Sequence, residues 1–248
     1  MTSDRRERAI ILASGPDDEA VRLAARWAVG QARESSILRV AVLVHGLSQI
    51  RTAAQTLGAA NAERVTREKT MRAADLDFGF YNSRAWTQAQ QVPQVCLWLT
   101  DDDMAKVERT VAPATVLVTW TREEGRSWAA GHGAVDLRGG DPADDLPTLD
   151  PVVQAALETI EGVNPSGNLS HPSDKGRVVQ AFEVLNQAGY ALDPEAIRAA
   201  LTGRRLTDHT AAAVAKIAAM IIEGHRFRVH RPLRDDILDL WREQAASP

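Results

Sequence analysis

The pattern of apolar residues changes near Leu137. Before this residue, short continuous apolar runs alternate with segments of helical periodicity, and after it only helical periodicity remains. Continuous apolar runs are typical of strands buried on both faces of a parallel sheet, and alternation with helices favours right-handed βαβ crossovers. The sequence therefore predicts an α/β fold, with a Rossmann-like, mainly parallel sheet flanked by helices and followed by a C-terminal α-helical bundle.

The length of the chain favours two domains. Its 248 residues exceed the usual single domain of about 100–150 residues. Glycine, proline and aspartate concentrate between Gly139 and Pro151, a composition typical of a linker. We therefore expect a Rossmann-like α/β domain over residues 1–140, a linker over 141–151 and an α-helical domain over 152–248.

The expected strands of the first domain are its apolar runs, of which the third is weaker because two aspartates and Gly79 interrupt it. They cover residues 9–13, 38–44, 75–81, 95–99, 115–120 and 134–137. Between them, helical periodicity predicts a helix whose start carries the favourable negative charge of Asp17, Asp18 and Glu19, and a longer, charged helical region over residues 48–73. A further helix is expected to begin at Thr100 or Asp101.

Start and stop signals divide the second domain into five short amphipathic helices. Asp193 followed by Pro194 is a typical helix start, and Thr207 or Asp208 is the expected cap of the next helix. Amphipathic helices must bury their apolar stripes against each other or against the sheet. This requirement is the basis for predicting a compact bundle.

Composition indicates an ordinary globular protein. The formal net charge is −4 and 44% of the residues are hydrophobic, so bulk charge does not favour nucleic acid as a partner. No apolar run approaches the roughly 18 residues of a membrane span. The single cysteine, Cys96, lies in an apolar run and has no partner for an internal disulfide. We therefore expect a cytoplasmic protein with a buried, inert thiol and no membrane partner.

Polar residues follow each expected strand. In open α/β sheets ligands bind beyond the carboxyl ends of the strands, and the residues at those positions are Ser14 and Gly15, His45 and Gly46, Asn82 and Ser83, Thr100 to Asp103, and Thr121 to Glu123. Turns and helix caps use the same residue types, so each position taken alone is more typical of a turn. The residues of this edge that we expect to bind a ligand are Ser14, Gly15, Asn82 and Asp101.

The first of these loops does not match a phosphate-binding motif. It contains neither G-x-G-x-x-G nor G-x-x-x-x-G-K-[ST], and Pro16 removes an amide donor. Asp17 and Asp18 also place negative charge where a phosphate would approach. A conventional NAD or P-loop site is therefore not expected, and the sequence identifies no cofactor.

The sequence assigns neither a metal site nor a catalytic residue. Adjacent aspartates at 101–103 point in different directions, so helix capping explains them better than magnesium binding. Ser14, His45 and one of these aspartates have the composition of a hydrolytic triad, but Ser14 lacks the G-x-S-x-G turn of a nucleophile elbow. Whether the protein is an enzyme stays open.

Two tryptophans, Trp98 and Trp120, lie near the carboxyl ends of the expected central strands. An indole at such a position can stack on a base or another flat ligand. Packing beneath a helix is the more common role of tryptophan in a buried strand. We therefore favour core packing and keep stacking as the alternative.

A second group of candidate ligand residues lies in the helical domain. We expect Ser173 to cap a helix, which places Lys175 and Arg177 in its first turns. Cations there oppose the helix dipole, whereas a bound anion would be stabilised by both cations and by the helix amides. The alternative is that Asp174 offsets the charge and both cations face solvent. Together with the sheet edge, this favours a small anionic or nucleotide-like ligand.

Two other functional classes stay open. A nucleic-acid-associated protein would use the arginines of the helical domain, which are Arg204, Arg205, Arg226, Arg228 and Arg231. Helices on either side of Gly203 have the spacing of a helix-turn-helix, but Lys216 is the only Lys or Arg in the second helix. The third possibility is a protein-interaction scaffold without catalysis.

Overall fold

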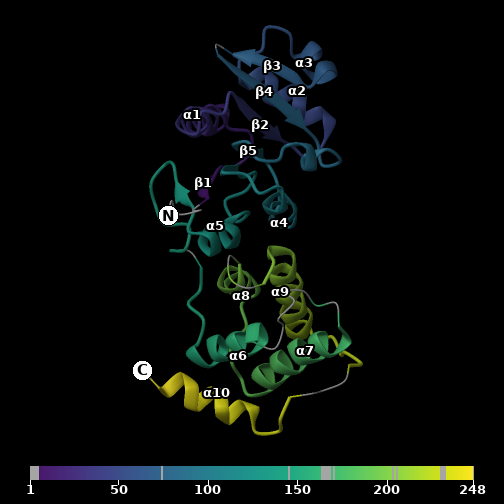
Figure 1. The fold of residues 1–248 in the computed structure, drawn as a ribbon. Helices are drawn as coiled ribbons and strands as arrows, with labels where there is room; N and C mark the ends of the chain where they lie inside the picture. The colour runs from purple at the N-terminus through teal and green to yellow at the C-terminus, as the bar shows by residue number, and fades with distance from the viewer. Residues whose placement is uncertain are drawn as a thin grey trace. The chain divides into compact units, whose positions relative to one another are not determined.

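The computed structural model describes residues 6–73, 75–144, 146–162, 169, 171–202, 204, 206–229 and 233–247. Contacts divide the chain into two compact units, Met1–Asp144 and Asp145–Pro248. Within the described residues the fold is mixed α/β, with a seven-stranded sheet and ten α-helices (Figure 1). No helix in these residues has both the length and the apolar character needed to cross a membrane.

The first unit is built on a mostly parallel sheet in the order β3-β4-β2-β5-β6-β1-β7. Its strands are β1 (Glu7–Ile11), β2 (Arg39–Leu43), β3 (Thr70–Ala73), β4 (Leu76–Tyr81), β5 (Gln94–Leu97), β6 (Ala114–Val118) and β7 (Val135–Asp136). All neighbouring strands run parallel except β3 and β4, which are antiparallel. The predicted α/β class and the mainly parallel sheet are thus confirmed.

Helices cover both faces of this sheet because the strands are apolar on both sides. Ile11 packs in a cluster with residues of α1 (Asp18–Glu34), α2 (Leu47–Thr56) and α3 (Ala62–Glu68). The adjacent Ile10 packs on the opposite face, with residues of α4 (Asp101–Val107) and α5 (Arg126–His132). Successive side chains of a strand point to opposite faces, so continuous apolar runs such as β1 require a layer of helices on each side.

The charged region over residues 48–73 is not one helical segment, and its last part is a strand. The α2 helix ends at Thr56, and Gly58 adopts a left-handed conformation with φ of 83°. Asn61 then caps α3 by accepting a hydrogen bond from the Arg64 amide at 2.9 Å. The segment after α3 pairs antiparallel with β4 as β3. Backbone pairing with an existing strand therefore overrides the helical composition there.

The second unit contains α6 (Pro151–Gly162), α7 (Pro172–Gln187), α8 (Pro194–Leu201), α9 (Asp208–Ile222) and α10 (Ile237–Ala246) among its described residues. A single apolar cluster includes side chains from all five helices, with Phe182 and Trp241 among its largest buried members. Asp193 and Thr207 cap α8 and α9 through their side chains, at the predicted starts of these helices.

The start of α7 differs from the prediction that Ser173 is its cap. His171 is the cap, and its Nδ1 accepts a hydrogen bond from the Ser173 amide at 3.3 Å. Pro172 is the first helical residue, a position where its fixed φ and its missing amide are tolerated. Lys175 and Arg177 are therefore the fourth and sixth residues of the helix, further from its N-terminal amides than predicted.

Candidate functional site

The strand order reverses between β2 and β5, which are neighbours in the sheet. From β2 the chain continues through α2, α3 and β3 to β4 on one side, whereas from β5 it continues through α4 to β6 on the other. The connections that leave the carboxyl ends of β2 and β5 therefore diverge. Such a divergence is where open α/β sheets form ligand-binding crevices.

A hydrogen bond joins the two connections at this reversal. His45 follows β2 and Asp103 lies in the first turn of α4, and their Nδ1 and Oδ2 atoms are 3.2 Å apart. The His45 side chain is 64% exposed, whereas the Asp103 side chain is only 7% exposed. A buried carboxylate thus holds an imidazole that solvent and ligands can reach.

Backbone contacts fix both partners of this pair. The His45 carbonyl accepts a hydrogen bond from the Ser83 amide at 3.3 Å, which ties the loop after β2 to the loop after β4. Thr100 caps α4 and accepts from the Asp103 amide at 3.3 Å. The imidazole and the carboxylate are therefore positioned by the main chain as well as by each other.

The pairing determines which nitrogen of neutral His45 is available. An ionised carboxylate can only accept hydrogen bonds, so Nδ1 donates to Asp103 and Nε2 becomes an acceptor. Nε2 makes no hydrogen bond to the described part of the chain. The other oxygen of Asp103 accepts from Lys106 Nζ at 3.3 Å. Nε2 can thus accept a hydrogen bond or a proton from a bound molecule.

Two tryptophans lie at the ends of β5 and β6, beside the reversal. Their rings are nearly perpendicular, at 89°, with centroids 6.0 Å apart. Trp98 is buried with a left-handed φ of 58°, and its indole N–H has no hydrogen-bond partner in the described structure. Trp120 is 45% exposed. Trp98 is thus a core residue, whereas Trp120 offers an indole surface to solvent.

Ser14 and Gly15 lie at the carboxyl end of β1, where three backbone amides already have acceptors within the protein. Gly15 has a left-handed φ of 74°, and its amide donates to the Trp120 carbonyl at 2.7 Å. The amides of Trp120 and Thr121 both donate to Glu124 Oε2 at 3.2 Å. Internal acceptors therefore occupy these three amides, which an anion would otherwise use.

Asp17, just after Gly15, is also engaged within the protein. Its side chain accepts from the Ala20 amide at 2.9 Å and pairs with Arg138 at 2.6 Å. These hydrogen bonds, first the one from the Ala20 amide, hold the pKa of this carboxyl below its usual value. Asp17 therefore caps α1 and stays negatively charged beside the first loop.

The remaining edge residues, Asn82 and Asp101, flank the reversal. Asn82 follows β4, its carbonyl accepts from the Ala85 amide at 2.8 Å, and it is half-buried. Asp101 is the first residue of α4 and is also half-buried. β4 and β5 lie on either side of β2, while β1 lies two strands beyond β5. The structure therefore brings Asn82 and Asp101 to either side of His45 and places Ser14 and Gly15 further along the edge.

The predicted ligand residues of the second unit have local partners. Lys175 Nζ lies 5.7 Å from the centre of the Phe227 ring. Arg177 pairs with Asp174 at 3.1 Å, so Asp174 offsets its charge. Both side chains therefore already have a partner within the second unit.

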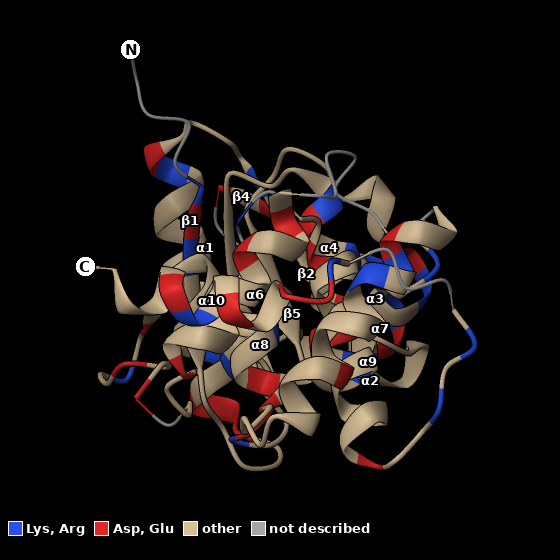
Figure 2. Ribbon diagram, turned by 90° about the horizontal axis from the view of Figure 1, so that it is seen from below, with Lys and Arg blue, Asp and Glu red and all other residues tan. Residues whose placement is uncertain are grey.

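The arginines of the nucleic-acid hypothesis have different surroundings. Arg204 pairs with Glu161 at 3.5 Å, whereas Arg226 and Arg228 are exposed. Arg205 and Arg231 lie outside the described residues. Basic and acidic residues are interspersed among the elements in Figure 2.

Neither a metal centre nor a serine triad is assembled in the described residues. They contain no group of three His, Cys, Asp or Glu side chains with metal-binding geometry. Ser14 follows β1, which β5 and β6 separate from the strand that precedes His45. The sequence placed His45 at the sheet edge but did not identify it as a ligand-binding residue. Its pairing with Asp103 depends on a strand order that the sequence does not reveal.

Part of the chain matches the model of one protein family. Residues 149–242 match the model of a domain of unknown function, DUF1889. This segment covers most of the second unit and less than half of the chain, and it does not include His45 or Asp103. No curated protein and no solved structure matches the chain.

Proposed function

We propose that the first unit binds a small anionic or nucleotide-like ligand at the carboxyl edge of its sheet, where the strand order reverses. The observation that carries this proposal is the hydrogen bond between His45 and Asp103. It spans the diverging connections and leaves Nε2 of an exposed imidazole available. A buried carboxylate that orients a histidine is a common way to prepare the imidazole for a ligand or a proton.

Side chains rather than amides would recognise the acidic group of the ligand. Lys106 supplies positive charge beside Asp103, and a proton that the acidic group of the ligand transfers to Nε2 of His45 makes the imidazole a second cation. The exposed indole of Trp120, which follows the end of β6 next to β5, offers a surface on which a base can stack. Asn82 and Asp101 add polar groups on either side of His45. Ser14 and Gly15 would contact only a ligand that extends along the edge to β1.

Thermal-shift measurements with adenosine monophosphate, ribose 5-phosphate, inorganic phosphate and adenosine test this proposal. A ligand present at 100 times its Kd stabilises the folded state by about 2.7 kcal/mol, so a specific compound raises Tm clearly. We expect adenosine monophosphate to raise Tm in the unaltered protein and in His225→Ala, a control at an exposed histidine of the second unit. His45→Ala should abolish the rise. An equal rise in both variants, or no rise with any compound, would refute the proposal.

The finer fold assignments belong to the same proposal. Parallel strands with helices on both faces support a Rossmann-like classification of the first unit, and one apolar cluster shared by five helices supports a C-terminal helical bundle. A cytoplasmic location is supported by Cys96, a buried thiol whose pKa is raised by burial. We take Lys175 and Arg177 as a secondary anion site within the second unit, available only if Asp174 releases Arg177.

Nucleic-acid binding is the second candidate, and one observation favours it. Between α9 and α10, Arg226 and Arg228 are exposed while Phe227 and Val229 pack against the apolar cluster. This alternation presents both cations to solvent. If the segment binds phosphate backbones, affinity for single-stranded DNA should fall steeply as the salt concentration rises. The double variant Arg226→Ala, Arg228→Ala should make the slope of log affinity against log salt concentration shallower, by the contribution of about two phosphate contacts. An unchanged slope would exclude this role.

A further inference from the structure

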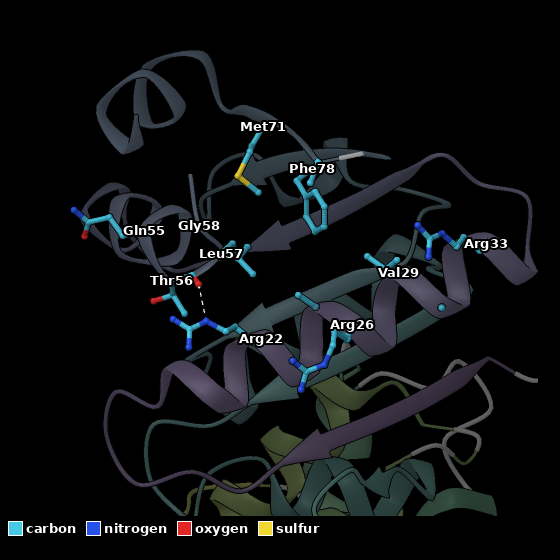
Figure 3. A pocket seen from close by; sticks show the side chains of 13 residues that line it. Arg22, Arg26, Val29, Arg33, Gln55, Thr56, Leu57, Gly58, Met71 and Phe78 are labelled. Atoms are coloured by element: carbon cyan, nitrogen blue, oxygen red, sulfur yellow. Dashed lines mark hydrogen bonds between the residues drawn. The ribbon is translucent and has the colours of Figure 1, made fainter. Parts of the chain in front are cut away.

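A cavity lies alongside α1, and neither His45 nor Asp103 lines it. Its volume is about 550 Å³, within the range of about 300–1,000 Å³ that is usual for small-molecule sites. Residues of α1, the end of α2, β3 and β4 line it. Figure 3 shows Met71 and Phe78 above the helix, with Leu57 below them and Arg22 and Arg26 along the helix.

The lining combines an apolar floor with basic residues. Its main apolar side chains are Val29, Leu57, Met71 and Phe78, and its basic ones are Arg22, Arg26 and Arg33, all from α1. None of the described lining residues is acidic. An apolar surface flanked by cations complements a molecule that has an apolar body and an acidic group.

The three arginines differ in the contacts that they already make within the protein. Arg22 Nε donates to the Thr56 carbonyl at 3.2 Å, and Arg33 pairs with Asp75 at 3.0 Å. Arg26 is exposed and has no hydrogen bond or ion pair to the described residues. Arg26 is therefore the guanidinium that can bind an anion without breaking an existing contact.

We propose that this groove binds an amphipathic organic anion, with an aromatic or aliphatic body on the apolar floor and its acidic group on Arg26. Arg22 anchors one wall through Thr56, and Arg33 lies at the other end of the groove, paired with Asp75. This site is separate from the His45 edge and does not depend on it. Its ligand class differs too, because the floor is apolar and provides no acceptor equivalent to Nε2 of His45.

Gly30 provides a way to close the groove without disturbing the fold. It lies within α1 and lines the cavity, and a Cβ added there meets nothing within 4 Å. Leucine is a better helix former than glycine. Gly30→Leu should therefore fill the groove and leave Tm unchanged or higher.

Fluorescence titration with 8-anilinonaphthalene-1-sulfonate, an aromatic sulfonate, tests the inference on the full chain. We expect saturable binding to the unaltered protein, at least fivefold weaker binding to Arg26→Ala, and no saturable binding to Gly30→Leu. Arg67→Ala is the matched control, because Arg67 is an exposed arginine of α3 outside the groove. This variant should bind the dye as the unaltered protein does.

The neutral analogue N-phenyl-1-naphthylamine distinguishes the contribution of the ligand's charge to binding from the contribution of its apolar body. It should bind equally to the unaltered protein and to Arg26→Ala, and it should not bind to Gly30→Leu. Unchanged sulfonate affinity in both Arg26→Ala and Gly30→Leu would place the dye elsewhere and overturn the inference. Equal weakening of both dyes by Arg26→Ala would overturn the assigned role of Arg26.

Discussion

Arg8 and Glu108 form a two-pronged ion pair in the first unit. Nε and one terminal nitrogen of Arg8 lie 2.9 and 2.7 Å from the two carboxylate oxygens of Glu108. The side chains are only 4% and 10% exposed. The indole N–H of Trp128 donates to the same carboxylate at 3.1 Å. Glu108 therefore links β1, where Arg8 lies, to α5, where Trp128 lies.

Removing the charge of Glu108 should strongly destabilise the first unit. In Glu108→Gln a buried guanidinium loses its counter-charge, and breaking a buried pair in this way costs about 3–5 kcal/mol. Urea unfolding should show this loss. The control is Glu68→Gln, which breaks the exposed pair between Arg64 and Glu68 and should cost at most about 1 kcal/mol. Equal losses in the two variants would contradict a buried, structural role for the Arg8 pair.

Asp17 should contribute stability that depends on pH. Its pKa in the folded state lies below the ordinary value of 3.8, so its stabilising charge is fully present above that value and is lost as pH falls through the folded pKa. Asn caps helices about as well as Asp, so Asp17→Asn removes mainly the charge. We expect the difference in unfolding free energy between the two proteins to be constant near neutral pH and to shrink below about pH 4. A difference independent of pH would argue against this account.

Any side chain added at Gly125 should destabilise the first unit. Its φ is 76°, and an added Cβ would lie 2.5 Å from Leu117 Cδ2 and 3.2 Å from Ile10 Cδ1. Gly133 also has a positive φ, but a Cβ there meets nothing within 4 Å. Gly133→Ala therefore measures the backbone cost alone, about 1 kcal/mol. Gly125→Ala should lose a further 1–3 kcal/mol or so from overpacking, as seen by chemical denaturation. Similar losses would mean that the core absorbs the methyl group.

Cys96 should be inert in the folded protein. The thiol is fully buried, and burial raises its pKa, so little thiolate forms near neutral pH. At pH 8, 5,5′-dithiobis(2-nitrobenzoic acid) should react with the protein only as fast as it unfolds, and immediately in denaturant. Rapid reaction of the native protein would show that the core around β5 opens readily.

Local sequence signals predicted much of this fold correctly. The acidic residues from Asp17 onward mark the start of α1, and the apolar runs around Ile10 and Val42 are strands buried on both faces, because charges at a helix start and continuous apolar runs depend on nearby residues. β3 was missed because its residues have no strand-like pattern of their own. Met71 and its neighbours become a strand only by pairing with β4.

The site was less predictable because it depends on which strands are neighbours. The sequence placed Asn82 and Asp101 at the carboxyl edge, since both follow strands. It did not show that β2 lies beside β5, which is what brings His45 to Asp103 from 58 positions away. In the same way, only the pairing of β1 with β6 reveals that the Gly15 amide is used by Trp120.

Chemical-shift mapping of adenosine monophosphate on the isotope-labelled protein tests the central claim most directly, because it locates the ligand as well as detecting it. The account predicts that shifted backbone amides cluster in the loops that follow β2, β5 and β6, around His45, Thr100 and Trp120. It also predicts that these shifts disappear in His45→Ala. Saturating shifts confined to other parts of the chain, or none at millimolar ligand, would contradict a binding site at the carboxyl edge.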